Sequence, residues 1–264
     1  MDLHISGKAA LVTGSARGIG SAIALRLALE GARVAVNDIG NKAEAESTVQ
    51  RIRESGGEAH FVQGDVSDEV EVERILSQSS DLVGPLDIVV NNAGIVSRKA
   101  ILEVSADEWD RVLRTNLTGC FNCSRLAARR MVSERRQGRI VNISSIHGIL
   151  AKQEMGAYCA SKAAIDTFSK QLAVELAPHG IGVNVVACGA IRTDINIALY
   201  KSVDPKDRAI QQALLRRIPL GFVGDPDDIA SAVAFLSSAT AARYITGAVV
   251  YVDGGYTADG TARI

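Results

Sequence analysis

The chain has 264 residues and a net charge of −1, with 47% hydrophobic and 22% charged residues. This composition is that of an ordinary globular protein, and it excludes a disordered or a fibrous one. A near-neutral charge provides no broad cationic field for nucleic acid or anionic lipid. We therefore expect neutral small molecules, or further copies of the chain, as partners.

The amino-terminal segment and the cysteines favour a cytoplasmic protein. Residues 1–7 lack the basic segment and apolar core of a secretory signal, and no stretch approaches the ~20 apolar residues that cross a bilayer. Cysteines are too few and too scattered for a disulfide framework. Cys120 and Cys123 form a C-x-x-C pair without a second pair, so we interpret them as small apolar side chains on one helix face. We expect no metal site.

Short apolar runs alternate with longer amphipathic ones along the chain. The short runs are rich in Val, Ile and Ala and apolar throughout, as are strands buried on both faces of a parallel sheet. We expect strands at Lys8–Thr13, Arg33–Asn37, Ala59–Gln63, Ile88–Asn91, Arg139–Ser144, Gly182–Ala187 and Ala248–Val252.

The amphipathic runs between these strands predict helices. Ser67 and Ser105 each precede acidic residues, which is a helix start signal. Gly31, Gly56 and Gly180 stand where C-terminal caps stand. The expected helices are Gly18–Glu30, Lys42–Ser55, Asp68–Leu82, Ala106–Ser133, Met155–Ala177 and Asp225–Ser237.

Alternating strands and helices predict an α/β fold, namely a Rossmann-type doubly wound parallel sheet of about seven strands with helices on both faces. The ligand crevice of such a sheet lies at the carboxyl ends of its strands. Without an internal repeat or a linker, residues 1–264 are expected to form a single dinucleotide-binding and catalytic domain. Residues 195–219 break the alternation and predict a polar, helical excursion over the crevice.

A glycine-rich turn, Thr13–Gly20, follows the first expected strand and opens directly into a helix. Its glycines let the backbone approach a pyrophosphate, whose charge the helix N-terminus stabilises. The spacing is G-x-x-x-G-x-G instead of the commoner G-x-G-x-x-G, so a purely structural turn is the alternative. The candidate cofactor-binding residues here are Gly14, Ser15, Arg17, Gly18, Ile19 and Gly20.

Asp38 ends the second expected strand, about 20 residues after Gly18, at the distance of a ribose-binding acid. A carboxylate there binds both ribose hydroxyls and repels a 2′-phosphate, which favours NAD over NADP. Arg17 favours NADP, because a guanidinium beside the ribose pairs with a phosphate. We expect the repulsion to dominate. Asp65 and Val66 end the third strand and are placed to contact adenine, although Asp-Val before a helix is also common in loops.

Tyr158 and Lys162 are four residues apart on an expected helix, so they share a face. A free tyrosine has a pKa near ~10 and stays protonated at neutral pH. A lysine ammonium ~4 Å away, at an effective dielectric constant of ~20, contributes about 4 kcal/mol and lowers the tyrosine pKa by about three. The pair is therefore a candidate acid and base, although this spacing also arises by chance.

Ser145 lies just past the fifth expected strand, at the edge where such a sheet places its ligand. It is a candidate donor to a substrate oxygen. Capping a turn is the alternative role, and Ser144 fits that role equally well. Asn116 lies inside a long helical pattern, where a buried amide must be hydrogen-bonded. It is either a structural kink or a link in a proton path.

Together these residues resemble the short-chain dehydrogenase/reductase family over nearly the whole chain, from about Gly7 to Tyr256. Each motif alone is weak, but their order and spacing match the family throughout. The matching segments are Thr13-Gly14-x-x-x-Gly18-x-Gly20, Asn91–Gly94, Asn116, Ser145, Tyr158-x-x-x-Lys162, Asn184, Ile218–Gly221 and Val252–Gly255.

The resemblance implies a catalytic tetrad. Tyr158 would be the acid and base, and Lys162 would lower its pKa and hold the nicotinamide ribose. Ser145, which precedes Tyr158 at the family's spacing, matches the substrate-binding serine better than Ser144. Asn116 would anchor a water relay to bulk solvent.

The resemblance also implies further cofactor contacts, a lid and an assembly. Residues 195–219 become a mobile substrate lid, and the last two helices and the last strand imply a homotetramer. The implied contacts are Asn92, Ala93 and Gly94 along the adenosine and ribose, and Ile191 and Thr193 at the carboxamide and pyrophosphate.

One position departs from the family pattern, since Cys188-Gly189 stands where members usually carry Pro-Gly. Loss of the proline predicts a looser backbone where the nicotinamide docks. It also places a thiol near the cofactor, unless that thiol is inert and buried.

Residues 144–147 and 189–196 look most like sugar 1-dehydrogenases of the glucose dehydrogenase type within the family. His147, Asn196 and Arg98 offer hydrogen bonds to a polyhydroxylated substrate, although such residues near a loop are more often caps or surface groups. We therefore expect a sugar or polyol as substrate, bound by Ser145, His147 and Tyr158.

Two alternatives stay open. The first is an NADPH-dependent 3-oxoacyl-carrier-protein reductase, whose acidic partner requires a basic patch near the entrance. The candidates for that patch are Arg129, Arg130, Arg135 and Arg136. The second is a non-catalytic nucleotide-binding regulator, which the fold alone does not exclude. The intact Ser145, Tyr158 and Lys162 argue against it.

Overall fold

The computed structural model describes residues 2–193, 202 and 204–259. In these residues, seven parallel strands form one sheet in the order β3-β2-β1-β4-β5-β6-β7. The strands are β1 (Ala9–Val12), β2 (Arg33–Asp38), β3 (Glu58–Gln63), β4 (Ile88–Asn91), β5 (Gly138–Ser145), β6 (Ile181–Cys188) and β7 (Val249–Val252). The predicted single-domain, doubly wound α/β fold is confirmed.

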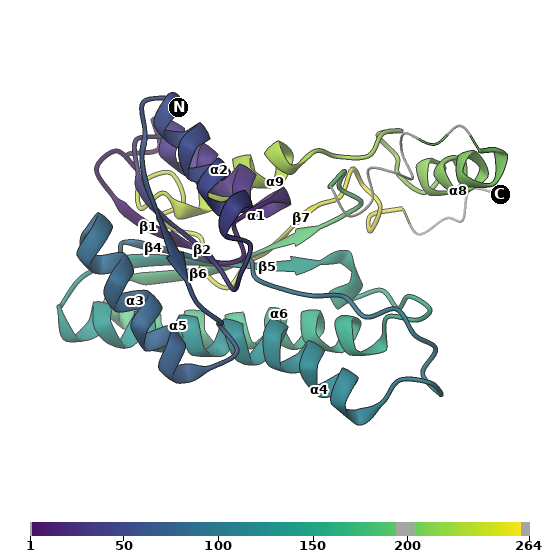
Figure 1. Ribbon diagram of the computed structural model, residues 1–264, viewed down its shortest axis with the longest axis horizontal. Coiled ribbons are helices and arrows are strands. Elements are labelled where there is room, and N and C mark those ends of the chain that lie inside the picture. Colours follow the sequence, from purple (N-terminus) through teal and green to yellow (C-terminus); the bar gives the residue numbers. More distant parts are fainter. Residues whose placement is uncertain (1, 194–201, 203, 260–264) are drawn as a thin grey trace.

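Helices cover both faces of the sheet (Figure 1). On one face lie α1 (Gly18–Leu29), α2 (Lys42–Glu54) and α9 (Pro226–Ser237). On the other lie α3 (Glu69–Val83), α5 (Gly119–Ser133) and α6 (Gly156–Leu176). The shorter elements are α4 (Ala106–Leu113), the 3₁₀ turns η2 (Ile146–Gly148) and η3 (Ala177–His179), and α8 (Pro205–Leu215).

The central strands explain why the sequence reads as continuous apolar runs. Every residue of β1, β4, β5 and β6 is buried, because helices pack on both sides of them. Two apolar clusters fill the two interfaces between sheet and helices. No helix in the described part of the chain is long and apolar enough to cross a membrane.

The segment expected as one helix over residues 106–133 is two helices separated by a π-helical turn, η1 (Arg114–Thr118). Asn116 lies in this turn and ties it to the loop after β4. Its Oδ1 accepts a hydrogen bond from the Ile95 N–H at 2.8 Å, and its Nδ2 donates to the Ile95 carbonyl at 3.0 Å. The backbone keeps helical φ and ψ values through this turn, so the expected helix over residues 106–133 is confirmed, with a π turn inside it that helical periodicity does not show.

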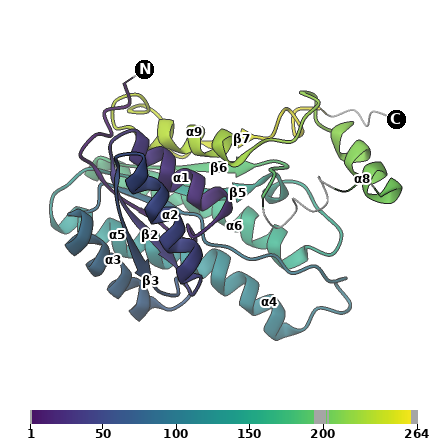
Figure 2. The same ribbon diagram turned by 45° about the horizontal axis from the view of Figure 1, so that its top comes forward.

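The expected excursion at residues 195–219 is described only in part, since residues 195–201 and 203 lie outside the described residues. Its described helix, α8, stands off the body of the protein on the side of the carboxyl ends of the strands (Figures 1 and 2). Asp204 caps this helix by accepting the Lys206 N–H at 2.8 Å, and none of its residues is buried. A role as a lid stays a prediction.

Candidate active site

The glycine-rich turn after β1 packs directly against the turn after β4. A Cβ on Gly14 would lie 2.7 Å from the Cα of Ala93, and a Cβ on Gly20 would lie 2.5 Å from Nδ2 of Asn92. Gly14 also has a φ of 59°, in the left-handed region that favours glycine. No side chain fits at either position, so the turn requires glycine at both.

Hydrogen bonds from Thr13 and Asn92 join these two turns. The Oγ1 of Thr13 accepts the N–H groups of Asn92 and Ala93, both at 3.1 Å. The Nδ2 of Asn92 donates to the carbonyls of Thr13 and Gly14, at 3.0 and 2.8 Å. The joint lies between β1 and β4, where the strand order reverses and a doubly wound sheet forms its ligand crevice.

Gly18 opens α1 and leaves space for a ligand. Its φ is 57°, and a Cβ built on it would meet nothing within 4 Å. Open space at a helix N-terminus is where a phosphate group accepts main-chain hydrogen bonds. Arg17, Gly18 and Thr193 line a groove of about 810 Å³ that extends between α2 and the start of α9. These features fit the pyrophosphate of a dinucleotide.

Ser15 and Ile19 face inward within the same turn. The Ser15 hydroxyl is fully buried, where it donates to the Val12 carbonyl at 2.7 Å and accepts the Asn37 N–H at 3.1 Å. Ile19 packs against the apolar cluster under α1. Both were expected to bind the cofactor; the structure leaves only the main chain of Ser15 for that role, whereas the side chain of Ile19 is partly exposed.

Asp38 ends β2 and is 8% exposed. Its Oδ1 accepts the N–H groups of Gly40 and Asn41, both at 3.3 Å, which holds the carboxylate at the edge of the crevice. Arg17 instead pairs with Glu44 of α2 at 3.5 Å. The acid and the arginine that favour different cofactors therefore lie on the same side of the crevice, and the arginine already has an anionic partner.

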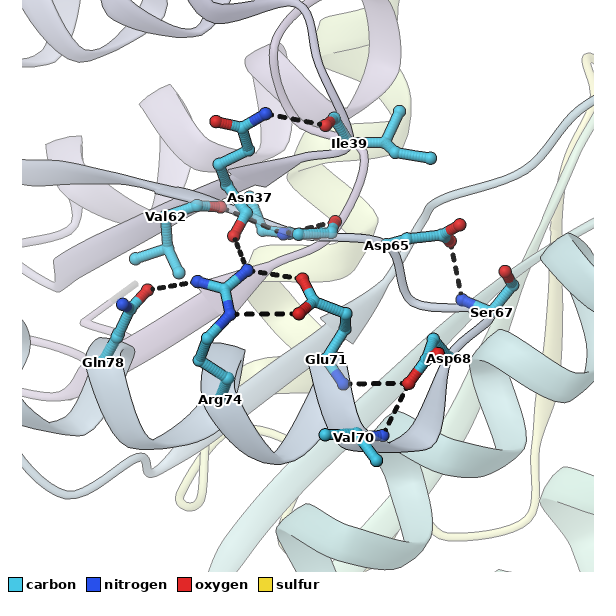
Figure 3. Close-up of polar contacts among 12 residues, drawn as sticks. Asn37, Ile39, Val62, Asp65, Ser67, Asp68, Val70, Glu71, Arg74 and Gln78 are labelled. Carbon is cyan, nitrogen blue, oxygen red and sulfur yellow. Dashed lines mark hydrogen bonds and ion pairs between the residues drawn. The ribbon is translucent and has the colours of Figure 1, made fainter.

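The predicted adenine-contacting pair, Asp65 and Val66, follows β3, and Figure 3 shows Asp65. Oδ1 of Asp65 accepts the Ser67 N–H at 2.8 Å and shapes the turn into α3. Val66 is buried against α5, where a Cβ on Gly119 would lie 2.7 Å from its Cγ2. Asn37 of β2 holds the neighbouring strand end by donating to the Val62 carbonyl at 3.0 Å. The fold thus places Asp65 beside the strand that ends in Asp38.

On the other side of the crevice, α6 brings Tyr158 and Lys162 to the end of β5. Ser145, the last residue of β5, lies close enough to Tyr158 to act on its hydroxyl and lower its pKa. Lys162 is 4% exposed, and its Nζ lies 5.6 Å from the centroid of the Tyr158 ring. The same Nζ donates to the Ile143 carbonyl at 2.8 Å. The structure therefore assembles the three side chains that the sequence singled out.

Burial dominates the charge state of this group. Burial raises the pKa of Tyr158 to about 12, and the hydrogen bond from Ser145 opposes that rise. Burial also lowers the pKa of Lys162. The Lys162 ammonium lies over the Tyr158 ring, but burial outweighs the other effects on the tyrosine pKa, so the expected lowering by Lys162 stays a prediction. Tyr158 holds its proton at neutral pH and is ready to donate it.

Asn116 connects to this group through α6. Its Nδ2 donates to Oγ of Ser161 at 3.1 Å, and Ser161 lies between Tyr158 and Lys162 in the sequence. A Cβ on Gly94 would lie 3.3 Å from Oδ1 of Asn116, so Gly94 also borders this amide. The contacts support the structural role of Asn116, while its part in a proton path stays a prediction.

His147 follows Ser145 in the turn η2. Its main-chain N–H donates to Oγ of Ser145 at 3.2 Å, and its Nδ1 lies 3.3 Å from the Leu150 carbonyl. Burial is the main cause that lowers the pKa of His147, so the imidazole is neutral at pH 7. A neutral, half-buried imidazole beside Ser145 can exchange a hydrogen bond with a substrate hydroxyl.

The other residues expected to contact the cofactor or the substrate lie in different environments. The side chain of Ile191 packs in the core, and its residue bridges to Gly224, so any contact with a carboxamide would use its main chain. Thr193 borders the groove beside Gly18. Arg98 is exposed on the loop after β4, and Asn196 lies outside the described residues.

Cys188 is the last residue of β6 and pairs in register with Ser145 on one side and Val252 on the other. It is therefore part of the sheet, and the looser loop expected from the missing proline is not observed at this residue. Burial raises the pKa of Cys188 to about 12, so its thiol is neutral and inert at pH 7.

The arginines expected as a docking patch lie at the opposite end of the sheet. Helix α5 runs from the end of β4 to the start of β5, so its last turn is remote from Ser145. Arg130 pairs with Glu73, and Arg136 with Asp87, both at 2.8 Å. The prediction of an entrance patch made of Arg129, Arg130, Arg135 and Arg136 was wrong, because helix direction places them at the amino ends of the strands.

Comparison with known proteins agrees with this geometry. Residues 14–257 match the family described as enoyl-(acyl carrier protein) reductase. The chain is 42% identical to the 3-oxoacyl-[acyl-carrier-protein] reductase FabG of Staphylococcus aureus, covering 94% of this chain and 97% of that protein. The chain belongs to the short-chain dehydrogenase/reductase family. It is an oxidoreductase that acts on CH–OH groups with a pyridine nucleotide.

Solved structures carry the same fold over nearly their whole length. A short-chain type dehydrogenase/reductase from Mycobacterium marinum is 38% identical with a TM-score of 0.88, covering 98% of each chain. A gluconate 5-dehydrogenase from Burkholderia cenocepacia, in complex with NADP and tartrate, is 34% identical with a TM-score of 0.89, again covering 98% of each chain.

Proposed function

We propose that the chain exchanges a hydride between a pyridine dinucleotide and a secondary alcohol or carbonyl of a sugar-like substrate, with Tyr158 exchanging the proton. The observation that carries this proposal is the grouping of Ser145, Tyr158 and the buried Lys162 at the end of β5, where the Lys162 Nζ lies 5.6 Å from the Tyr158 ring centroid. Acid and hydrogen-bond donor thus stand at the edge where a sheet of this kind binds its ligand.

The dinucleotide would lie along the joined turns after β1 and β4. The backbone at Gly14, Gly18 and Gly20 leaves the space, and the start of α1 supplies N–H groups for its pyrophosphate. Asp38 and Asp65 would meet the adenosine end, and Thr193 the pyrophosphate. When bound, the nicotinamide supplies or accepts the hydride.

The residues of α6 and β5 would handle the proton. In reduction, the Tyr158 hydroxyl gives its proton to the carbonyl oxygen, and Ser145 donates a hydrogen bond to the same oxygen. This transfer leaves a Tyr158 phenolate, which the buried positive charge of Lys162 would stabilise, and in oxidation the phenolate takes a proton back from the alcohol. Asn116 would anchor the path by which Tyr158 is reprotonated.

Two cations beside His147 support a substrate with an anionic group. The positive charges of Lys152 and Arg217, after burial, act to lower the pKa of His147. Arg217 stacks on Tyr256, with its guanidinium carbon 4.6 Å from the ring centroid. Neither cation forms an ion pair within the described residues. A hydroxy acid of the sugar series would use both the cations and the imidazole, and one similar structure is a gluconate 5-dehydrogenase with tartrate bound.

A 3-oxoacyl-carrier-protein reductase is the second candidate, favoured by the 42% identity to FabG. Lys152 and Arg217 would also suit an acidic carrier, whereas the arginines at the end of α5 lie away from the site. The likeness to glucose-type sugar 1-dehydrogenases stays a proposal. A non-catalytic regulator would behave identically with or without the Tyr158 hydroxyl.

The cofactor preference rests on Asp38. We propose NAD, because a buried carboxylate at the end of β2 repels a 2′-phosphate while Arg17 is paired with Glu44. The comparisons do not favour NAD, since a similar structure holds NADP. The proposal predicts a higher kcat/KM with NAD than with NADP on the same substrate.

Edge strand β7 and the outer faces of α5 and α6 support a homotetramer. All four residues of β7 are only half-buried, and Phe121 and Val174 are exposed apolar side chains on the helices. Light scattering coupled to size exclusion tests this assembly, which a monomer at micromolar concentration would contradict. We also propose the cytoplasm as its location, because all four cysteines are free.

The function is tested by initial rates of NADH and NADPH formation over aldoses, aldonates, polyols and simple secondary alcohols, with 3-oxoacyl thioesters run in reverse. Turnover of an aldose or aldonate with NAD is the expected result. Turnover restricted to 3-oxoacyl thioesters with NADPH would overturn the substrate class and the cofactor preference together.

A further inference from the structure

Asp166 is a buried acid next to the candidate catalytic pair of Tyr158 and Lys162, and it has no part in the proposed reaction. It lies on α6, four residues after Lys162, and is 7% exposed. Its Oδ1 has no hydrogen-bond partner among the described residues. A buried carboxylate that is not fully hydrogen-bonded is unfavourable unless a nearby charge compensates it. The spacing of four places the Lys162 ammonium on the same helix face.

Asp166 also contacts the turn that carries Ser145, on both sides of that residue. Before it, the Ser144 hydroxyl donates to the Lys162 carbonyl at 3.3 Å and lies close enough to the Asp166 carboxylate to lower its pKa. After it, a Cβ on Gly148 would lie 2.5 Å from Oδ2 of Asp166. The carboxylate thus packs directly under the backbone of this turn, where no side chain fits at residue 148.

The groups that face Lys162 leave Asp166 as its counter-charge. They are Tyr158 and Asp166 on α6, Cys188 on β6 and Cys120 on α5. Burial raises the pKa of Cys120 and of Cys188 to about 12, so both thiols are neutral at pH 7. The phenol of Tyr158 is neutral as well. Among the described residues, Asp166 is therefore the group whose negative charge can act on Lys162 at neutral pH, although the two side chains form no direct ion pair.

The surroundings of Asp166 favour its ionised form in part. Burial raises the pKa of Asp166, whereas the hydrogen bond from Ser144 and the charges of Lys162 and Lys170 lower it. Tyr251 of β7 is the other titratable group that faces it, and it is neutral at pH 7 because burial raises its pKa.

We propose that Asp166 is a positioning residue for the acid–base pair: its carboxylate keeps the buried Lys162 ammonium charged, and it fixes the turn that presents Ser145. This inference rests on the proposed roles of Tyr158, Lys162 and Ser145.

Loss of the negative charge of Asp166 shifts the pKa values of Lys162 and Tyr158 in the same direction. A nearby anion favours an ammonium and disfavours a phenolate, so its removal lowers the pKa of Lys162 and that of Tyr158. Both limbs of the pH profile of alcohol oxidation should therefore move to lower pH. For charges about one helical turn apart, the shift is on the order of one pH unit.

The test compares Asp166→Asn with Asp166→Ala, with Glu175→Gln as a matched control. Asn keeps the size of the side chain and a polar group beside Ser144 but removes the charge, whereas Ala removes all three. Glu175 is an exposed acid on the same helix, so its substitution changes the net charge equally. The first readout is the titration of Lys162 by NMR in lysine-labelled protein without cofactor, assigned with Lys162→Met. The second is the pH profile of kcat, with KM and the melting temperature.

Asp166→Asn is expected to lower the Lys162 titration midpoint and to move the kcat profile to lower pH, with kcat at the new optimum within about twofold. Asp166→Ala is expected to add a roughly tenfold loss of kcat with an unchanged KM for the dinucleotide, because the Ser145 turn loses its support. Should Asp166→Ala fail to fold, Asp166→Ser replaces it as a small variant.

An unchanged Lys162 midpoint in Asp166→Asn would overturn the counter-charge. Equal kcat values in Asp166→Asn and Asp166→Ala would overturn the positioning of the turn. The NMR titration needs neither cofactor nor substrate, so it stays decisive even if the proposed reaction is not found.

Discussion

The two sides of the crevice prepare for their ligands by different means. On the β1–β2–β3 side, the binding surface is backbone: Gly14 and Gly20 have no room for a side chain, and Thr13 and Asn92 hydrogen-bond the two turns together. On the β5–β6 side, the working parts are ionisable side chains of α6, held in a buried place where Tyr158 and Lys162 both titrate away from their usual range.

The difference has a physical consequence for how each side fails. A binding surface made of backbone is disrupted when a substitution adds atoms to it. Such substitutions act sterically and lower protein stability and nucleotide affinity together. A buried ionisable group is disrupted by a lost charge or proton, so its defects change turnover with less effect on folding. The predictions below separate these two kinds of failure.

The largest effect is expected for Lys162→Met, which keeps a side chain of similar length and removes the buried charge. Without it, the Tyr158 phenolate is not stabilised, and kcat should fall by about 10²–10⁴-fold. The melting temperature should change little, because desolvation of the ammonium is also removed. Lys170→Met, an exposed position on the same helix, is the control and should retain kcat. Similar losses in both variants would contradict a specific role.

Gly14→Ala should act on the other side by a steric route. Its Cβ would lie 2.7 Å from the Cα of Ala93, at a φ of 59°. We expect a loss of about 2–4 kcal/mol in the free energy of unfolding, with weaker dinucleotide binding. Gly56→Ala, at a φ of 85° and with nothing within 4 Å, is the matched control for denaturant melts and nucleotide titrations. If Gly14→Ala unfolded at the same denaturant concentration as the wild-type protein, the turns after β1 and β4 would not be rigidly joined.

Asp38→Asn tests the candidate ribose-binding acid at the end of β2. Removal of the repulsion toward a 2′-phosphate should raise the ratio of kcat/KM for NADP over NAD by about tenfold, or about 1.4 kcal/mol. Glu44→Gln, which releases Arg17 from its ion pair, should raise the same ratio by a smaller factor. An unchanged ratio in Asp38→Asn would remove the argument for NAD.

The smallest effect is expected for Cys188→Ala. The thiol is buried and protonated, and the residue is held by strand pairing on both sides. We expect kcat within about twofold of wild type and a loss of roughly 1 kcal/mol from the small cavity. A much larger loss of turnover, measured beside an unchanged melting temperature, would show that the thiol takes part in the site.

Much of the fold could be predicted because the determining signals are local. Continuous apolar runs such as residues 139–144 and start signals such as Ser105 are visible in the sequence, and the structure places a strand and a capped helix there. The π turn at Asn116 could not be predicted, since it depends on the main chain of Ile95, which is distant in the sequence.

The candidate site was predictable in its composition but less so in its electrostatics. The spacing of Tyr158 and Lys162 fixes a shared helix face, but not that the Lys162 ammonium bonds the Ile143 carbonyl and lies over the ring. Burial, which decides both pKa directions, is a property of the packed molecule. Asp166 shares that helix face too, and only its contacts with Ser144 and Gly148 single it out.

The central claim is that Tyr158 exchanges the proton while the backbone side holds the nucleotide. The most direct measurement is turnover and dinucleotide affinity of Tyr158→Phe beside the wild-type protein. The account predicts that kcat falls at least a hundredfold while the dissociation constant of the dinucleotide stays within about threefold. Retained turnover in Tyr158→Phe would contradict the account, as would a loss of nucleotide binding equal to the loss of turnover.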